Sequence, residues 1–419
     1  MIIRAGTVVT MDGLPIDNGA VAVSGSRITN VGKFSEISAT NSGEQIVDLG
    51  EQALLPGLIN AHCHLDYTCL RDKIPPPKSF TEWIRAINAE KANLSPEDYV
   101  HSIKEGFAEA KRFGTTTIAN LTAFPELIRR IKSLVRTWWF AELIDIREPS
   151  RASEIVDAAL EKLKSTEHWG LAPHAPFTAS ANLYRRCEKI ARSEDVPLTT
   201  HLAESREEMS MFRDARGSLY KFLKEIGRDM SDCGQRTPLG HFSEILRDSS
   251  TSVGMTENWI VVHLNELVDD DFDLLASSRK KFSVIHCPRS HEYFGHSPFQ
   301  FEKLCELGFN ICLGTDSLAS NDDLNLFAEM RAFRKEFPNI SPEEVLNMVT
   351  VNSAHALRQE DALGKIRSDY LADLIAVPCT RHGESVQGRT RSTSVFDEIV
   401  SFDRGVSWSM IGGQVQNSA

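Results

Sequence analysis

The central part of the chain alternates between β-prone runs and helical segments. The predicted strands cover residues 58–64, 115–119, 138–144, 170–174, 197–201, 259–263, 282–286 and 309–314. Helices separate most of them; the segment from Asp98 to Phe113, for example, places Ile103 and Phe107 at helical spacing before Gly114 ends it. Eight strands that alternate with helices predict a (β/α)₈ barrel, the TIM barrel of the α/β class, with its active site at the carboxyl ends of the strands.

The two ends of the chain are rich in short β-prone runs separated by turns. Such runs occur at residues 2–3, 7–10, 20–23 and 28–31 near the start, and at 372–377, 398–400 and 406–411 near the end. Neither end has enough apolar sequence to form a good core alone. We therefore predict one small β-sandwich-like domain built from residues 1–53 and 365–419, which flanks a barrel formed by residues 54–364.

Composition and charge argue against several classes of partner. Of the 419 residues, 41% are hydrophobic and 25% are charged, as in an ordinary globular protein. The formal net charge of −12 opposes binding to nucleic acid or to an anionic membrane surface, both of which need clustered Lys and Arg. The basic segment from Arg381 to Arg391 is interrupted by Gly and Ser, which favours a solvated loop. We predict no nucleic-acid partner, and the sequence leaves a homo-oligomer open.

Three features bear on the compartment in which the protein works. No apolar stretch approaches the roughly 20 residues of a membrane span. The first five residues lead directly into a β-prone run, without the apolar core of a signal peptide. The eight cysteines form neither a C-x-x-C pair nor a disulfide-like spacing, which suits a reducing compartment. We predict a cytoplasmic protein without a membrane segment.

Histidines and acidic residues recur where the predicted strands end. The first strand ends in His62 and His64, which an extended backbone places on the same side. The fourth, fifth, sixth and eighth strands end in His174, in His201 followed by Glu204, in His263 and in Asp316. One H-x-H pair is weak evidence for a metal site, but five such strand ends converge in a barrel. That convergence predicts a catalytic metal centre.

The chemistry of these groups suggests a division of labour. His62, His64 and His201 supply neutral nitrogen ligands, and Asp316 adds a carboxylate, which leaves one position open for water. A divalent ion held there lowers the pKa of that water towards neutrality. Glu204, three residues beyond a ligand, would move a proton between the water and a substrate nitrogen.

Several of the remaining residues have plain structural alternatives. His263 either orients the attacking water or is a hydrogen-bonded structural histidine, and Glu204 could instead be a carboxylate at a helix start. His174 is assigned to a hydrogen bond with the substrate or the departing group. Asp66 is either a turn residue or a support for the metal ligands. His291, after the seventh strand, is a candidate to line the pocket.

Three motifs resemble signatures of the amidohydrolase superfamily. They are the run from Leu55 to His64, the His201-to-Glu204 motif and the sequence Gly314-Thr315-Asp316-Ser317, and the split β domain is similar too. Within that superfamily the chain most resembles the S-adenosylhomocysteine/methylthioadenosine deaminases and the aminodeoxyfutalosine deaminases. The shared features are His-x-x-Glu on the fifth strand, Pro-His-x-Pro on the fourth, and the segment from Ser317 to Asn321.

The resemblance implies a metal content and a set of substrate contacts. Two-metal members carry a carboxylated lysine at the end of the fourth strand, where this chain has His174 and no nearby lysine. One divalent ion is therefore implied, Zn²⁺ in preference to Fe²⁺. The segment around Glu82 is similar to the one with which those deaminases bind ribose hydroxyls. Ser317 and Asn321 are further substrate-binding residues that the resemblance implies.

The same resemblance leads to an expected function. We expect a metal-dependent aminohydrolase that releases ammonia from an adenine-type nucleoside with a modified 5′ end. Aminodeoxyfutalosine is the preferred substrate, because its carboxylate could pair with Arg147, Arg206 or Arg289. S-adenosylhomocysteine, methylthioadenosine and adenosine are the other substrates that fit.

Two alternatives stay open at this point. A related hydrolase would cleave a cyclic amide, or displace a ring substituent such as chloride, with the same metal and Asp316 but a different need for a proton donor. A catalytically inactive barrel could serve as an interaction protein. We disfavour the inactive barrel because such chains lose metal ligands, and here all of the predicted ligands are present.

Overall fold

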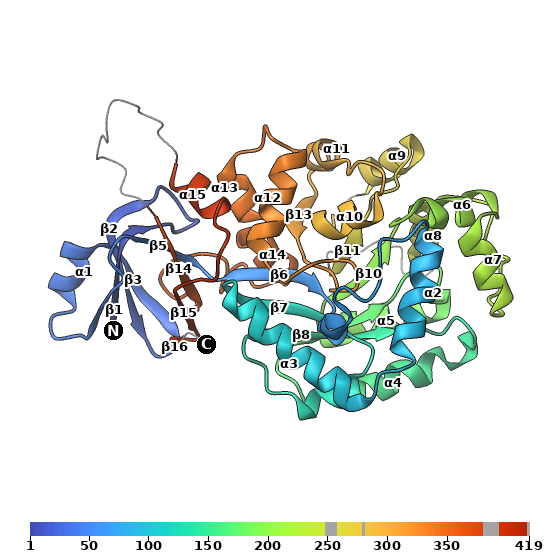
Figure 1. The fold of residues 1–419 in the computed structure, drawn as a ribbon, viewed down its shortest axis with the longest axis horizontal. Coiled ribbons are helices and arrows are strands. Elements are labelled where there is room, and N and C mark those ends of the chain that lie inside the picture. Colours follow the sequence, from blue (N-terminus) through green and yellow to red (C-terminus); the bar gives the residue numbers. More distant parts are fainter. Residues whose placement is uncertain (248–257, 279–280, 380–393, 417–419) are drawn as a thin grey trace.

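The computed structural model describes residues 1–247, 258–278, 281–379 and 394–416. Two sheets organise this part of the chain, a barrel surrounded by helices and a mixed sheet beside it (Figure 1). The segment from Arg381 to Arg391, for which a solvated loop is predicted, lies outside the described residues. Among the helices of the described ranges, none is both long and apolar enough to cross a membrane.

Eight parallel strands form the barrel, as the sequence predicts. They are β6 (Leu58–Cys63), β7 (Thr115–Thr122), β8 (Arg136–Leu143), β9 (Trp169–Pro173), β10 (Leu198–Leu202), β11 (Trp259–His263), β12 (Ser283–His286) and β13 (Asn310–Leu313). Each strand pairs with the next one along the chain, and a parallel bridge between Cys63 and Asp316 joins the last strand to the first. The predicted fold class is confirmed, and the ends of these strands meet on one side.

Helices cover the outside of the barrel (Figure 1). They are α2 (Phe80–Lys91), α3 (Pro96–Arg112), α4 (Ala152–Leu163), α5 (Ala181–Glu194), α6 (Arg206–Asp214), α7 (Ser218–Glu225), α8 (Pro238–Arg247), α9 (Asp269–Ser277), α10 (Pro288–Phe294), α11 (Phe301–Glu306), α12 (Leu326–Glu336), α13 (Pro342–Asn347) and α14 (Val351–Ala356), with 3₁₀ turns η1 (Leu65–Leu70), η2 (Pro125–Arg130) and η3 (Pro149–Arg151). Ser95 and Asp98 form a capping box at the start of α3, and Gly114, with φ of +81°, follows its end. These signals explain why α3 begins and ends there.

Two apolar layers hold the barrel together. Inside it, side chains from successive strands pack on one another, including Ile59, Phe140 and Val262. Outside it, helix residues pack on the strands, as where the rings of Phe107 and Trp139 meet edge to face at 5.9 Å. Full burial of each such side chain contributes about 1.5–3 kcal/mol. The barrel is therefore a firm support for the loops at its carboxyl end.

Both ends of the chain build the second sheet together. Its strands are β1 (Ile2–Val8), β2 (Ile16–Ser24), β3 (Arg27–Lys33), β4 (Ile46–Asp48), β5 (Gln52–Pro56), β14 (Leu374–Pro378), β15 (Trp408–Ile411) and β16 (Gln414–Gln416), with helix α1 (Phe34–Thr40) against them. Antiparallel pairing of β5 with β14 joins the two ends, in register from Leu374 opposite Pro56. Strands from both ends of the chain therefore form one mixed sheet, as the sequence predicts. The exact domain boundaries stay predictions, and β5 spans the predicted boundary at residue 53.

One predicted strand is a helix. The sequence predicts a strand at residues 398–400, but these residues form the last part of helix α15 (Val395–Val400). The hydroxyl of Ser394 accepts a hydrogen bond from the backbone N–H of Asp397 and caps the helix start. Val395 and Ile399, four residues apart, are both buried in the core. Capping and helical spacing therefore outweigh the β propensity of the short run Ile399-Val400.

Gly57 lies where the second sheet meets the barrel. A Cβ atom at this position would lie 2.1 Å from Oγ1 of Thr116, while the Gly57 N–H donates to the carbonyl of Asp373. Gly57→Ala should therefore lower the free energy of unfolding by about 1–3 kcal/mol, which a thermal melt measures. Gly32→Ala is the matched control, because its Cβ would meet nothing closer than 3.5 Å. Equal melting temperatures for the two variants would contradict this prediction.

Candidate active site

Three imidazoles meet at the carboxyl end of the barrel. The rings of His62, His64 and His201 have centroids 4.9–5.3 Å apart, and one nitrogen from each lies within 4.8 Å of the other two. Nε2 of His64 is 3.2 Å from Nε2 of His201. All three side chains are buried. Residues that are 137 positions apart in sequence therefore form one compact cluster of nitrogen donors.

Asp316 completes this cluster from the end of β13. Its Oδ1 lies 3.7 Å from Nε2 of His62 and 3.9 Å from Nε2 of His64. The residue has a left-handed φ of +58°, which turns the chain out of the strand. Ser290 Oγ donates to Oδ2 and the Ser317 N–H donates to Oδ1, both at 2.8 Å. These two donors fix the carboxylate in the direction of the histidines.

The cluster fits a divalent metal ion. Both ring nitrogens of His62 are buried, and neither has a hydrogen-bond partner among the described residues. Unpartnered buried polar atoms are costly and rare, and a metal would satisfy one of them. Nδ1 of His201 lies 3.0 Å from the carbonyl of His174, an arrangement that leaves Nε2 of His201 free to face the cluster. Three nitrogen donors and one carboxylate are a ligand set that suits zinc.

Burial favours the neutral form of His64, His174 and His201. It lowers the pKa of His201 to about 3 and the pKa of His64 well below the ordinary value. Burial, followed by the charge of Lys91, lowers the pKa of His174 to about 3. For Asp316 burial opposes ionisation, but the surrounding histidines hold its pKa well below the usual range. At neutral pH the site therefore presents free imidazole lone pairs and a carboxylate, which are the forms that bind metal.

The lowered pKa values predict how metal binding depends on pH. Because His201 takes up a proton only near pH 3, protons should not compete for this ligand between pH 7 and 5. An ordinary histidine, with a pKa of about 6.5, would be mostly protonated at pH 5. We expect the metal content per folded chain, measured by elemental analysis after gel filtration, to be the same at both pH values. Release of the metal by pH 5 from a chain that is still folded would contradict this.

Glu204 and His263 lie beside the cluster. Oε1 of Glu204 is 3.6 Å from Nε2 of His263 and 3.9 Å from Nε2 of His296. Burial, with the nearby charges of Asp316 and Glu207, raises the pKa of Glu204 well above its usual value. A buried carboxyl with a raised pKa is suited to act as a general acid.

Glu208 holds the loop that carries Glu204. Its carboxylate is fully buried and accepts the backbone N–H of Glu204 at 2.8 Å and that of Ala203 at 3.2 Å. Ala203 has a φ of +50°, so the turn after β10 depends on this support. The loop position of Glu204 is therefore set by a second glutamate four residues further along the chain.

This support predicts a loss of turnover when Glu208 is removed. Glu208→Ala should lower kcat about 10- to 100-fold, since small displacements of a catalytic group cost that much. The metal content should stay unchanged, because Glu208 lies outside the ligand cluster. Glu208→Gln keeps one acceptor oxygen and should recover part of the activity. Full activity of Glu208→Ala would show that the loop needs no such support.

The cluster opens into a cavity of about 150 Å³. One wall is apolar and largely aromatic, and it is lined by Tyr67, Phe80, Trp83, Ile84, Ile87, Ile144 and Phe177. Polar groups line the remainder, namely His64, Asn88, Lys91, Glu142, His174, Thr178, His201, Glu204, His263, Asp316 and Ser317. The rings of Phe80 and Trp83, both from α2, stack at 5.9 Å. Such a wall suits a flat ring, and the polar groups face it from the barrel.

Two charged cavity residues, Glu142 and Lys91, are absent from the sequence-based site. Glu142, at the end of β8, has its Oε1 3.7 Å from Nδ1 of His64 and 3.9 Å from Nε2 of His174. It was missed because the predicted strand ran on to residue 144, which placed Glu142 inside the strand. Lys91 ends α2. Its spacing of four residues from Ile87 and eight from Trp83 puts all three on one helix face, but the spacing does not show that this face lines the cavity.

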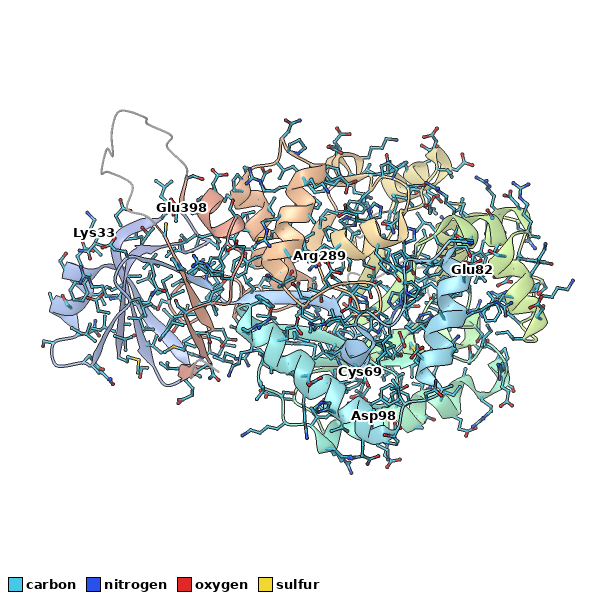
Figure 2. The ribbon with its side chains drawn as sticks, in the orientation of Figure 1. Lys33, Cys69, Glu82, Asp98, Arg289 and Glu398 are labelled. Carbon is cyan, nitrogen blue, oxygen red and sulfur yellow. The ribbon has the colours of Figure 1, made fainter. Side chains whose placement is uncertain are left out.

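Other predicted residues lie away from the cavity. Glu82, labelled on α2 in Figure 2, is exposed and does not line the cavity, although its neighbours on that helix do. Arg147 is exposed in the loop after β8. Arg206 donates to Ser297 Oγ at 3.1 Å. These three side chains therefore do not contribute to the lining of the cavity within the described residues.

Arg289 is already neutralised by its own chain. Its guanidinium forms ion pairs of 2.6 Å with Asp323 and 2.7 Å with Asp322. The carboxylate of Glu329 lies 3.9 Å away and is completely buried. A cation with this many acidic partners is not available to a substrate carboxylate.

Three further predicted residues have structural contacts. Asn321 donates to the Thr315 carbonyl and to Glu329 Oε1, both at 2.7 Å, and so fixes the loop that carries Asp316. Asp66 accepts from Thr122 Oγ1 and from the N–H of Ala123, both at 3.0 Å, which agrees with the turn alternative. His291 lies 2.8 Å from the Ser297 carbonyl through its Nε2 and does not line the cavity. Of the predicted substrate contacts, His174 and Ser317 do line it.

The barrel and this site define a class of protein. A (β/α)₈ barrel with three histidines and an aspartate at its carboxyl end is the arrangement of a metal-dependent hydrolase. The sequence profile of the amidohydrolase family matches residues 53–411. The chain belongs to the amidohydrolase family, a metal-dependent family of hydrolases that act on carbon–nitrogen bonds.

Known proteins similar to this chain include several deaminases. A protein of Syntrophobacter fumaroxidans named 5-methylthioadenosine/S-adenosylhomocysteine deaminase is 31% identical over 401 residues, which cover 90% of this chain and 84% of that protein. Aminofutalosine deaminase of Helicobacter pylori, solved in complex with methylthio-coformycin, is 19% identical with a TM-score of 0.84, over 99% of this chain and 100% of that chain. An adenosine deaminase of Xanthomonas campestris with bound zinc is 23% identical with a TM-score of 0.76, over 99% of this chain and 92% of that chain. These two structures share the fold.

Proposed function

We propose that the protein is a metal-dependent deaminase of an adenine-type nucleoside with a modified 5′ end. The observation that carries this proposal is Glu204, a buried carboxyl beside His263, in the same cavity as the cluster of metal-binding side chains. The relatives named as methylthioadenosine/S-adenosylhomocysteine and aminofutalosine deaminases support the choice of an adenine-type ring. Release of ammonia is the expected outcome of each turnover.

We assign the metal to His62, His64, His201 and Asp316, and we propose one Zn²⁺ rather than Fe²⁺. When bound, the ion supplies Lewis acidity that activates water for attack on the amino-bearing ring carbon. His201 is oriented for this task by the carbonyl of His174, and Asp316 by Ser290 and Ser317. These supports fix the ligands before the ion arrives.

Glu204 moves the protons of the reaction. In its protonated form it donates to the ring nitrogen next to the reacting carbon, and its carboxylate then accepts a proton from the attacking water. It passes that proton to the amino group, which leaves as ammonia, and takes up the hydroxyl proton as the ring carbonyl forms. His263, 3.6 Å away, faces the same oxygen of Glu204 and orients the water. Because both side chains are buried, the proton passes between them and the substrate rather than to bulk solvent.

The cavity wall positions the substrate ring. The stacked pair Phe80 and Trp83 gives the flat ring an apolar surface, and Phe177 lies across from Phe80 at 6.5 Å. His174 is held through Nδ1, which is 2.6 Å from Oγ1 of Thr178, so that Nε2 faces the cavity. We propose that this nitrogen and Ser317 bind polar atoms of the substrate.

A substrate screen tests the proposal. Purified protein loaded with Zn²⁺ should release ammonia from at least one of adenosine, methylthioadenosine, S-adenosylhomocysteine and aminodeoxyfutalosine. Cyclic amides and chlorinated triazines, included in the same screen, stand for the related hydrolases. Turnover of only those compounds would replace the deaminase proposal, and the absence of ammonia from every nucleoside would remove it.

A further inference from the structure

The cavity contains two oppositely charged side chains that the deamination chemistry does not use. Glu142 lies at its inner end, next to the metal-binding histidines, and Lys91 belongs to the helix that covers it. The three arginines predicted to bind a substrate tail lie elsewhere. Among the described residues that line the cavity, Lys91 is the one basic side chain apart from the histidines.

Lys91 lies further from the metal-binding cluster than Glu142. The Tyr67 ring stacks on His64 with centroids 5.8 Å apart, and the Lys91 ammonium lies 4.7 Å from the centroid of the Tyr67 ring. Lys91 is therefore separated from His64 by one aromatic ring. Its side chain is half-buried, and its ammonium forms no ion pair with any described residue. A cation of this kind in a cavity can accept an anionic group of a ligand.

Glu142 makes the two ends of the cavity differ in charge. Its side chain is 6% exposed, its Oε1 has no hydrogen-bond partner among the described residues, and it lies within 3.9 Å of both His64 and His174. Together with Asp316 it offsets the double positive charge of a divalent ion in the cluster, so the inner end has no net positive charge to attract an anion. Lys91 is then the cation in the cavity that attracts an anionic substituent. The amino-bearing ring of the same molecule is then turned inward.

We propose that Lys91 is a specificity-determining residue, which binds a carboxylate on the 5′ substituent of the nucleoside. This inference rests on the proposed deaminase function and narrows its substrate class to nucleosides with an acidic 5′ substituent. The apolar stack of Phe80 and Trp83 lies on the same helix as Lys91. One helix therefore holds the ring through its aromatic residues and the charged substituent through its last residue.

A pair of matched substrates tests this inference. Aminodeoxyfutalosine carries the carboxylate, its methyl ester lacks the charge, and methylthioadenosine is a small neutral reference. The wild type should prefer the acid to the ester, and Lys91→Met should lower kcat/KM for the acid about 10-fold or more. For the ester and for methylthioadenosine the same variant should change kcat/KM less than about 2-fold. Adenosine 5′-monophosphate, if accepted through Lys91, would point to phosphate as the anion.

Controls separate this inference from the proposed function. Lys91→Arg should recover the preference for the acid, and Lys104→Met, on the exposed face of α3, should change nothing. If Lys91→Met does not fold, Lys91→Gln replaces it, with the metal content and the melting temperature as checks. An equal loss on the acid and on the ester would overturn the role of Lys91. A wild type that deaminates none of these nucleosides would instead overturn the proposed function.

Discussion

Glu204→Gln should lower kcat about 10²- to 10⁴-fold, the range that a positioned general acid contributes. The amide keeps the size of the side chain but cannot donate and then accept the same proton. The ligand cluster does not include Glu204, so the metal content should stay at the wild-type value. Ammonia release under saturating substrate, together with elemental analysis of the same sample, measures both quantities.

A matched variant controls for effects that any glutamate-to-glutamine substitution would have on this protein. Glu225→Gln replaces an exposed glutamate at the end of α7, where its pair with Arg85 is a surface ion pair worth little. This control should keep wild-type activity. Unchanged turnover of Glu204→Gln would remove Glu204 from the mechanism. Loss of the metal in that variant would show that Glu204 supports the ligands rather than the proton transfers.

The clustering of the proposed ligands could be predicted because the fold of a barrel determines where the ends of its strands lie. His62, His201 and Asp316 each follow a β-prone run, and parallel strands of one barrel end on the same side. No knowledge of individual side-chain contacts was needed for that step. The structure brings these residues together within a few ångströms, as the pattern predicts.

The substrate side of the cavity could not be predicted in the same way. Whether a residue of α2 faces the cavity or the solvent depends on how the helix rotates against the barrel, which sequence spacing alone does not fix. Glu82 and Lys91 are both charged residues of that helix, yet Glu82 is exposed and Lys91 lines the cavity. Helical spacing groups Lys91 with Trp83 and separates it from Glu82, but it does not say which group faces inward.

Ion pairs within the chain were the other source of error. Arg289 was expected to be free for a substrate carboxylate, but Asp322 and Asp323 neutralise it from a loop more than 30 residues away. Such partners depend on the folding of the loop after β13 against α10. A charge that is unpaired in the sequence is therefore weak evidence for a binding role until its tertiary neighbours are known.

Asp316→Ala should remove both the metal and the activity. The variant deletes the one proposed carboxylate ligand and leaves three imidazoles, so the proposed centre loses a negatively charged ligand. Changes to residues that merely support ligands already cost about 10- to 100-fold in metal affinity, and loss of a ligand should exceed that. We expect the metal content to fall from about one ion per chain to a small fraction after dialysis.

Ser290→Ala is the control for this variant, because it removes a hydrogen bond to Asp316 at 2.8 Å and keeps the ligand itself. It should bind metal more weakly than the wild type but more tightly than Asp316→Ala. Ammonia release should follow the metal content in all three proteins, and excess Zn²⁺ should restore Ser290→Ala alone. If Asp316→Ala kept its metal and its turnover, Asp316 would not be a ligand, and the four-residue centre proposed for this barrel would have to be abandoned.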